Sequence, residues 1–179
     1  MQLKLSAAVL LASLGWAAPG SGQVQRMTDE QQAWFNCVVS TEWCVANSIE
    51  KATQQKRAVA MVAAAKPLII SGRASRVTLQ VACSKDQPIT MLHTAREIAQ
   101  NEISLHYRVE PSGRTGDLVG KNASAGHFFE FASQEFLKDL AGAEKASVEA
   151  NFSSQKEASV LEFNVSGTNT ALKRLKCFR

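Results

Sequence analysis

The fold is indicated most directly by Arg76–Cys83, RVTLQVAC, in which apolar and polar residues alternate. Successive side chains of a β-strand point to opposite faces of a sheet, so the odd-numbered residues from Val77 to Cys83 share one face. The stretch is also rich in β-branched residues, which favour strands. It therefore predicts a sheet strand that carries Cys83 on its buried face.

The same period of two recurs on both sides of this strand. The clearest case is ISLHYRVE at 103–110, which ends at the turn residues Pro111-Ser112-Gly113. Its expected buried row is Ile103, Leu105, Tyr107 and Val109. Further strands are expected at 44–49, 57–64, 88–94, 127–131, 146–152 and 159–165, although the alanine-rich segment 57–64 is also compatible with a helix.

Helical patterns occur at three places. The segment from Gln23 to about Trp34 is expected to form a short helix capped by Thr28, or a flexible arm. A second helix is expected at 133–142 with Ser133 as its cap, and a third after Gly167 with Thr168 or Asn169 as its cap. Their buried stripes are expected to be Phe136, Leu137 and Leu140 in the second helix, and Ala171, Leu172 and Leu175 in the third.

Short strands separated by turns, with few helices, predict a mainly β fold. We expect an antiparallel β-sandwich or open barrel with a short N-terminal helix and a C-terminal helix. The sheet domain is expected at 43–179, after a lead-in segment at 23–42. About 157 residues after removal of a leader are enough for one core.

The first 22 residues have the three parts of a secretory signal peptide. Lys4 lies in the head, an apolar run covers Leu5–Trp16, and small residues follow from Ala18 to Gly22. The apolar run is shorter than the roughly 20 residues that cross a bilayer, and no cysteine follows it for lipid attachment. The sequence therefore predicts cleavage after Gly20 or Gly22 and a location in the periplasm or outside the cell.

Export would place the four cysteines in an oxidising compartment, where an even number indicates disulfides. Four cysteines allow three pairings. We favour Cys37 with Cys44, which closes a short loop, and Cys83 with Cys177, which attaches the C-terminal helix to a central strand. A zinc site is disfavoured because no CxxC pair is present and no histidine lies near a cysteine in sequence.

Neither the charge nor the sequence motifs indicate nucleic-acid binding or catalysis. The chain has 20 Lys and Arg against 16 Asp and Glu, spread along its length, which does not indicate a nucleic-acid partner. The three histidines, His93, His106 and His127, all fall on predicted strands without metal-ligand spacing. Ser166 precedes Gly167 but lacks the GxSxG pattern. We therefore predict no catalytic, cofactor-binding or metal-binding residue.

Glycines are frequent between Pro111 and Gly126, PSGRTGDLVGKNASAG. The GxxxxGK[ST] pattern of a phosphate-binding loop is not met, because Lys121 is followed by Asn122. We expect a long mobile loop between strands here, of the kind that often carries binding residues.

The C-terminal half resembles exported accessory proteins of the type VI secretion VasI kind and, more loosely, invasion-associated locus B proteins. The likeness rests on VTLQVACSKDQPITML, HYRVE, HFFEF followed by EFLKDL, and EASVLEFNVSGTNTALKRLKC, and covers roughly Trp43 to Cys177. The residues that carry it specifically are Cys83, Gly167, Ala171, Leu172, Leu175 and Cys177. VasI-like chains usually have a tryptophan-serine pair in the loop that here is GDLVGKNASAG, and this loop has no tryptophan. The resemblance implies the fold and an exported location.

A second resemblance is to periplasmic lysozyme inhibitors, whose inhibitory loop is similar to SGRxxY. This chain has SGR at 71–73 and at 112–114, both without the tyrosine. A serine and an arginine on a rigid loop can hydrogen-bond catalytic carboxylates. The candidate partner-binding residues are therefore Ser71, Arg73, Ser112 and Arg114.

Together these features predict a non-enzymatic periplasmic protein that binds a protein or cell-envelope partner, in secretion or host interaction. The alternative is an inhibitor or immunity protein against an envelope hydrolase such as lysozyme. Neither hypothesis involves a cofactor, nucleic acid or a transmembrane segment, and both leave the oligomeric state open.

Overall fold

The computed structural model describes residues 27–49, 56–131, 134–152 and 157–178. The predicted signal peptide and the expected cap Ser133 lie outside the described residues. Among the described helices, none is long and apolar enough to span a membrane.

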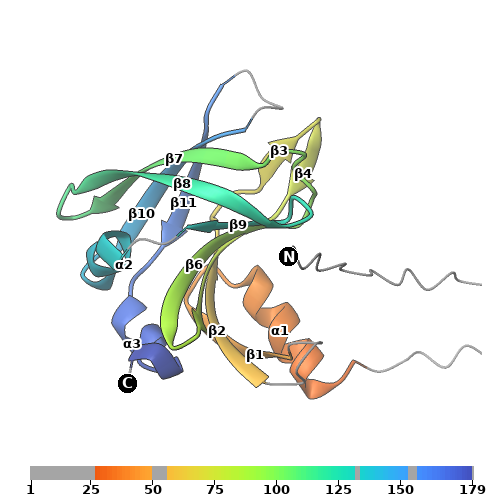
Figure 1. Cartoon of the computed structure of the whole chain (residues 1–179), viewed down its shortest axis with the longest axis vertical. Coiled ribbons are helices and arrows are strands. Elements are labelled where there is room, and N and C mark those ends of the chain that lie inside the picture. Colours follow the sequence, from red (N-terminus) through yellow and green to blue (C-terminus); the bar gives the residue numbers. More distant parts are fainter. Residues whose placement is uncertain (1–26, 50–55, 132–133, 153–156, 179) are drawn as a thin grey trace, which may run out of the picture.

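The fold is mainly β, as predicted, and is built on one large antiparallel sheet (Figure 1). Along the sheet the strands follow the order β1-β2-β5-β6-β9-β8-β7-β10-β11. Their bounds are Cys44–Ile49 (β1), Lys56–Ala63 (β2), Val77–Ser84 (β5), Gln87–Thr94 (β6), Glu102–Glu110 (β7), Thr115–Ser124 (β8), Phe128–Phe131 (β9), Lys145–Asn151 (β10) and Ser159–Asn164 (β11). A separate hairpin consists of β3 (Leu68–Ile70) and β4 (Arg73–Ser75).

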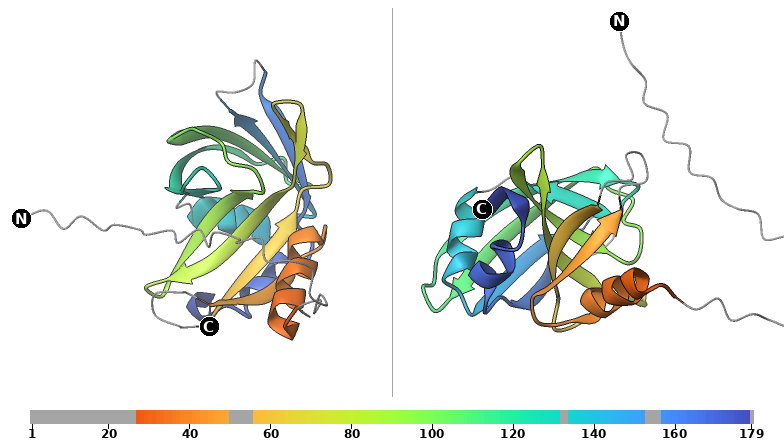
Figure 2. Two further views of the ribbon diagram at one scale, coloured as in Figure 1. Left: turned by 90° about the vertical axis from the view of Figure 1, so that its right-hand side faces the viewer. Right: turned by 90° about the horizontal axis from the view of Figure 1, so that it is seen from below.

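The sheet curls until its two ends approach each other, so the open-barrel alternative describes it well (Figure 2). The amide of Ala65, just beyond β2, donates to the carbonyl of Glu162 in β11 at 2.8 Å. Close by, the indole Nε1 of Trp43 donates to Thr168 Oγ1 at 2.9 Å and to the carbonyl of Val165 at 3.2 Å. These contacts tie the residues that flank β1 and β2 to β11 and to the residues just after it.

The main core fills the concave side of the sheet. The row predicted on β7 is confirmed, since Ile103, Leu105, Tyr107 and Val109 are all buried and alternate with exposed residues. Helix α2 (Gln134–Ala141) closes one end of this core with Phe136, whose ring lies 4.7 Å from that of Tyr107. The stripe predicted on this helix, Phe136, Leu137 and Leu140, is also confirmed.

A second, smaller cluster lies on the outer side of the sheet, under helix α1 (Asp29–Val39). The helix is capped by Thr28, whose hydroxyl accepts from the Gln31 amide in a capping box, and it runs five residues past the expected end at Trp34. Cys37 of α1 packs with Met61 and Ala82 of the sheet. Strand β5 is therefore buried on both faces for most of its length.

The prediction of a long loop between Pro111 and Gly126 is wrong, because most of this segment forms β8. Its sequence lacks the alternation of apolar and polar residues seen on β7, and most of its side chains are exposed. Its glycines instead make room for neighbours: a Cβ at Gly116 would lie 2.6 Å from Tyr107 Cε1, and one at Gly120 would lie 2.8 Å from Ile103 Cγ1. Large residues on β7 thus occupy the space that side chains of β8 would need.

The C-terminal segment forms α3 (Thr168–Leu172) and a 3-10 turn, η1 (Lys176–Phe178). The predicted cap is wrong: Gly167 is the N-cap, in a left-handed conformation with φ +83°. Thr168 instead donates through its hydroxyl to the carbonyl of Val165. The predicted stripe, Ala171, Leu172 and Leu175, is buried, and both disulfides form as favoured, Cys37 with Cys44 and Cys83 with Cys177.

Candidate functional site

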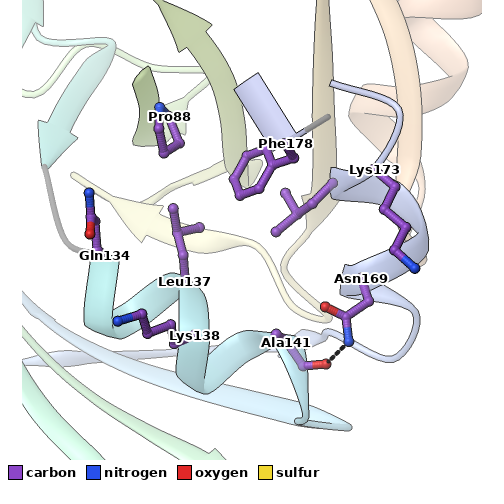
Figure 3. A pocket seen from close by; sticks show the side chains of 9 residues that line it. Pro88, Gln134, Leu137, Lys138, Ala141, Asn169, Lys173 and Phe178 are labelled. Atoms are coloured by element: carbon purple, nitrogen blue, oxygen red, sulfur yellow. Dashed lines mark hydrogen bonds between the residues drawn. The ribbon is translucent and has the colours of Figure 1, made fainter. Parts of the chain in front are cut away.

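A groove of about 350 Å³ lies where α2, α3, η1 and the start of β6 meet (Figure 3). We call it the α2–α3 groove. Its apolar lining comes from Pro88, Leu137, Ala141, Leu172 and Phe178, and its polar lining from Gln134, Lys138, Asn169 and Lys173. The apolar residues come from three separate parts of the sequence, which are the start of β6, α2, and the C-terminal segment with α3 and η1.

Helix α2 supplies one side of the α2–α3 groove. Its amphipathic sequence turns Phe136 and Leu140 into the main core, while Leu137 is largely buried and still reaches the groove. The other side comes from α3, where Leu172 is equally buried. Asn169 links the two helices, because its side-chain amide donates to the carbonyl of Ala141 at 2.7 Å. The last carbonyls of a helix have no partner within it, so this bond satisfies one of them.

The third wall depends on the Cys83–Cys177 disulfide. The bond fixes η1 against β5, and the Cys177 amide also donates to Cys83 Sγ at 3.0 Å. Phe178, the next residue, is half-buried and faces Pro88 across the groove (Figure 3). The disulfide therefore holds an aromatic side chain in place at the end of the chain.

Two lysines lie at the rim of the α2–α3 groove. Figure 3 shows Lys138 and Lys173 on either side of the apolar residues. Both are exposed, and neither forms a salt bridge with a carboxylate of the described residues. Among the residues that the structure describes, no carboxylate lines this groove. The rim is therefore positively charged around an apolar floor.

A polar pocket of about 390 Å³ lies on the other side of Lys138, between α2 and the β7–β8 turn. At its centre Asp139 accepts hydrogen bonds from Tyr107 Oη at 2.9 Å and from Arg114 Nη1 at 2.8 Å. We call these three residues the Tyr107–Asp139–Arg114 cluster. It joins the turn after β7 to helix α2.

The cluster moves the pKa values of Tyr107 and Asp139 further from neutral pH. Burial of the phenol and, after it, the hydrogen bond to Asp139 raise the pKa of Tyr107 to about 12. The hydrogen bond from Arg114 lowers the pKa of Asp139 below its ordinary value of 3.8, against the opposing effect of burial. An acid–base pair works best with pKa values near the ambient pH, so the cluster has the character of a structural network.

The four residues predicted for a binding loop fall into two separate places. Ser71 and Arg73 belong to the β3–β4 hairpin, whereas Ser112 and Arg114 belong to the β7–β8 turn at the opposite side of the molecule in Figure 1. Arg114 is 67% exposed, but it binds Asp139, and its amide donates to Ser112 Oγ at 3.4 Å. The structure therefore does not bring the two SGR segments together.

The histidines also lie apart from the α2–α3 groove. His93 on β6 and His106 on β7 are on strands as predicted, whereas His127 is in the turn before β9 and that prediction is wrong. Burial and then the nearby His127 lower the pKa of His93, whose ring lies 4.5 Å from that of Phe128. Within the described ranges, no group of three or more His, Cys, Asp or Glu residues is placed to hold a metal ion.

Sequence patterns did not identify the α2–α3 groove. They placed Leu137 and Leu172 only in the core, and Phe178 was overlooked although it follows the cysteine that holds the chain end. The groove is the candidate binding site because it combines an apolar floor with two rim lysines that form no salt bridge with another described residue. In comparisons with known proteins, no protein-family model, curated protein or solved structure matches the chain.

Proposed function

We propose that this is a non-enzymatic binding protein of the periplasm or the secreted space, and that its α2–α3 groove holds an apolar segment of a protein partner. The observation that carries the proposal is the groove itself. Its floor combines Leu137, Leu172 and Phe178, and its shape is fixed by a disulfide and by the hydrogen bond between Asn169 and Ala141. Concave apolar surfaces with a few polar groups at the edge are typical of binding sites.

The chemistry of the lining supports binding more than catalysis. The groove residues offer amides, ammonium groups and apolar side chains, without the nucleophile and base that covalent catalysis pairs together. At about 350 Å³ the groove is at the lower limit for small-molecule pockets, which span about 300–1,000 Å³. A groove of this size suits one or two side chains of a larger partner.

The proposed location rests on the predicted signal peptide and is supported by the two disulfides, which form and persist in oxidising compartments. The resemblance to VasI-like and locus B proteins extends the proposal to an accessory role in secretion or host interaction. Its six specific residues contribute to the C-terminal attachment that builds one side of the α2–α3 groove.

Obstruction of the groove tests this function. Ala141 is half-buried in the lining, so Ala141→Phe should fill the groove. Ala74→Phe adds the same side chain at an exposed position of β4 and is the matched control. Envelope proteins captured by the oxidised wild type would be purified and their affinities measured by calorimetry against all three forms, after equal thermal stability has been verified.

We expect a partner whose affinity falls at least about tenfold with Ala141→Phe and stays unchanged with Ala74→Phe. Equal affinity for the wild type and Ala141→Phe would exclude the groove as the binding site. The control is sound because β4 lies far from α2 and α3 in Figure 1.

A second candidate function is inhibition of an envelope hydrolase such as lysozyme. It is favoured by the 67% exposure of Arg114 on the β7–β8 turn, where a bidentate donor could reach catalytic carboxylates. The test is a lysozyme activity assay with the wild type, Arg114→Ala and Arg73→Ala. Inhibition that is lost with one of these variants would support this function, and absence of inhibition by the wild type would exclude lysozyme as the target.

A further inference from the structure

We infer that the segment bound in the α2–α3 groove is acidic as well as apolar: a bulky apolar side chain enters the groove, and carboxylates on both sides of it contact Lys138 and Lys173. This inference rests on the proposed function and specifies its partner.

The first support is the charge of the rim. The two charged residues among those that line the groove are Lys138 and Lys173, and neither has a carboxylate partner within 4.0 Å among the described residues. Arg174, which is exposed and follows Lys173 in the sequence, adds to the positive charge. An anionic segment is therefore steered to the groove and a cationic one is repelled.

Nearby carboxylates do not cancel this charge. Asp139 is occupied by Tyr107 and Arg114, and Asp86 lies 3.2 Å from Lys176 rather than from the groove lysines. Glu135 lines the polar pocket and is not among the residues that line the groove. Lys138 and Lys173 thus form no salt bridge with another described residue and can contact an incoming carboxylate.

The placement of the lysines favours a peptide over a fatty acid. Lys138 belongs to α2 and Lys173 is the C-cap of α3, and the two flank the apolar floor on two sides (Figure 3). A peptide can carry a carboxylate before and after its apolar residue, whereas a fatty acid has one carboxylate at one end. The alkyl stems of lysines can also lie along apolar surface while their ammonium groups stay in water, which extends the contact with a peptide.

The test is selection from a random peptide library on phage, with the oxidised wild-type protein as bait and Ala141→Phe for counter-selection. Enriched peptides would be synthesised and their affinities measured by fluorescence anisotropy. The Lys138→Glu/Lys173→Glu double variant tests the charges. Lys66→Glu, in an exposed turn after β2 outside the groove lining, is the matched control.

We expect peptides with a large apolar residue between acidic residues. Each exposed ion pair is worth up to about fivefold in affinity, and a reversed charge also repels the carboxylate. The double reversal should therefore weaken binding about tenfold, with the loss reduced at high salt and absent in Lys66→Glu. Groove-dependent peptides without acidic residues, or with unchanged affinity for the double variant, would overturn the inference and leave the proposed function standing.

Two other results separate the remaining possibilities. If no enriched peptide depends on Ala141, the proposed function and the inference both fail. A fluorescent fatty acid, dansyl-undecanoic acid, provides the lipid probe. If it binds the wild type and loses binding with Ala141→Phe, while no peptide is selected, the groove binds a lipid and the inference is overturned.

Discussion

Cys177, two residues before the end of the chain, is bonded to Cys83 of β5 across 94 residues, and its neighbour Phe178 forms a wall of the α2–α3 groove. One covalent bond therefore fixes the chain end to the sheet and shapes the candidate binding site. Helices as short as α3 are marginal by themselves, so the bond replaces packing area that this segment lacks.

Removal of this bond should destabilise the protein strongly. In the chain-entropy model, the loop closed by Cys83 and Cys177 contributes about 4–5 kcal/mol, so the Cys83→Ser/Cys177→Ser variant should lose stability of that order. Urea unfolding without reductant measures the change. The Cys37→Ser/Cys44→Ser variant is the control: its loop spans 7 residues, and the expected loss is about 2–3 kcal/mol. A larger loss for the shorter loop would contradict this prediction.

Gly116 should be intolerant of a side chain. A Cβ there would meet the Tyr107 ring at 2.6 Å, and that ring is held by Asp139 and Phe136. Gly116→Ala should therefore cost about 1–3 kcal/mol, as over-packing typically does. Gly142→Ala is the control, because a Cβ at Gly142 has no neighbour within 4 Å. Chemical denaturation of both variants checks the prediction, which fails if they are equally stable.

Tyr107 is the only tyrosine of the chain, so its ionisation can be followed by tyrosinate absorbance. We expect titration at a pKa of about 12 in the folded protein and about 10.0 in denaturant. Between these values the folded state binds more protons than the unfolded state, so the free energy of unfolding falls as the pH rises from about 10 to about 12.

Two variants test the hydrogen bond between Tyr107 and Asp139. Asp139→Asn removes the anionic acceptor and should bring the pKa of Tyr107 part of the way back towards 10.0, because burial, the larger cause, remains. Tyr107→Phe should cost about 1 kcal/mol at neutral pH, the typical net value of one hydrogen bond. Normal tyrosine titration in the folded wild type would contradict the proposed network.

His93 should make stability sensitive to mild acid. Burial holds its pKa below 6.5, so the unfolded chain binds more protons than the folded chain between the lowered value and 6.5. The free energy of unfolding therefore rises with pH across this window and falls on acidification below about pH 6.5. Urea unfolding of the wild type and His93→Gln over this range measures the effect.

His127 supplies the second comparison. Its charge lowers the pKa of His93 as the smaller of two causes, so His127→Gln should reduce the acid sensitivity only in part. His93→Gln should flatten the profile more than His127→Gln. The reverse order would show that His93 is not the group responsible.

Much of the fold could be predicted because several strands show alternation that matches their burial. On β7 and β10 every second residue is buried, and the sequence has apolar residues there. β8 could not be predicted in this way, since the residues that fit its neighbours are glycines, which carry no apolar signal. The residues that fit on β8 are therefore determined by the large side chains of β7, its neighbour in the sheet.

The candidate site was harder to predict for a related reason. The curl of the sheet and the attachment of the chain end bring Pro88, Leu137 and Phe178 together. Neither feature can be predicted from the local periodicity of apolar residues. The contact of Arg114 with Asp139 is of the same kind, because it joins a turn to a helix 25 residues later. The disulfide pairing was predictable, but the groove it helps to form was not.

The position of Phe178 has a practical consequence for every binding assay proposed above. Because this residue lines the α2–α3 groove, an affinity tag fused after Arg179 would be separated from a groove residue by one position in the sequence. A histidine-rich or acidic tag could occupy the groove or screen its lysines. Purification handles therefore belong ahead of α1, which lies away from α3 and η1 in the right panel of Figure 2.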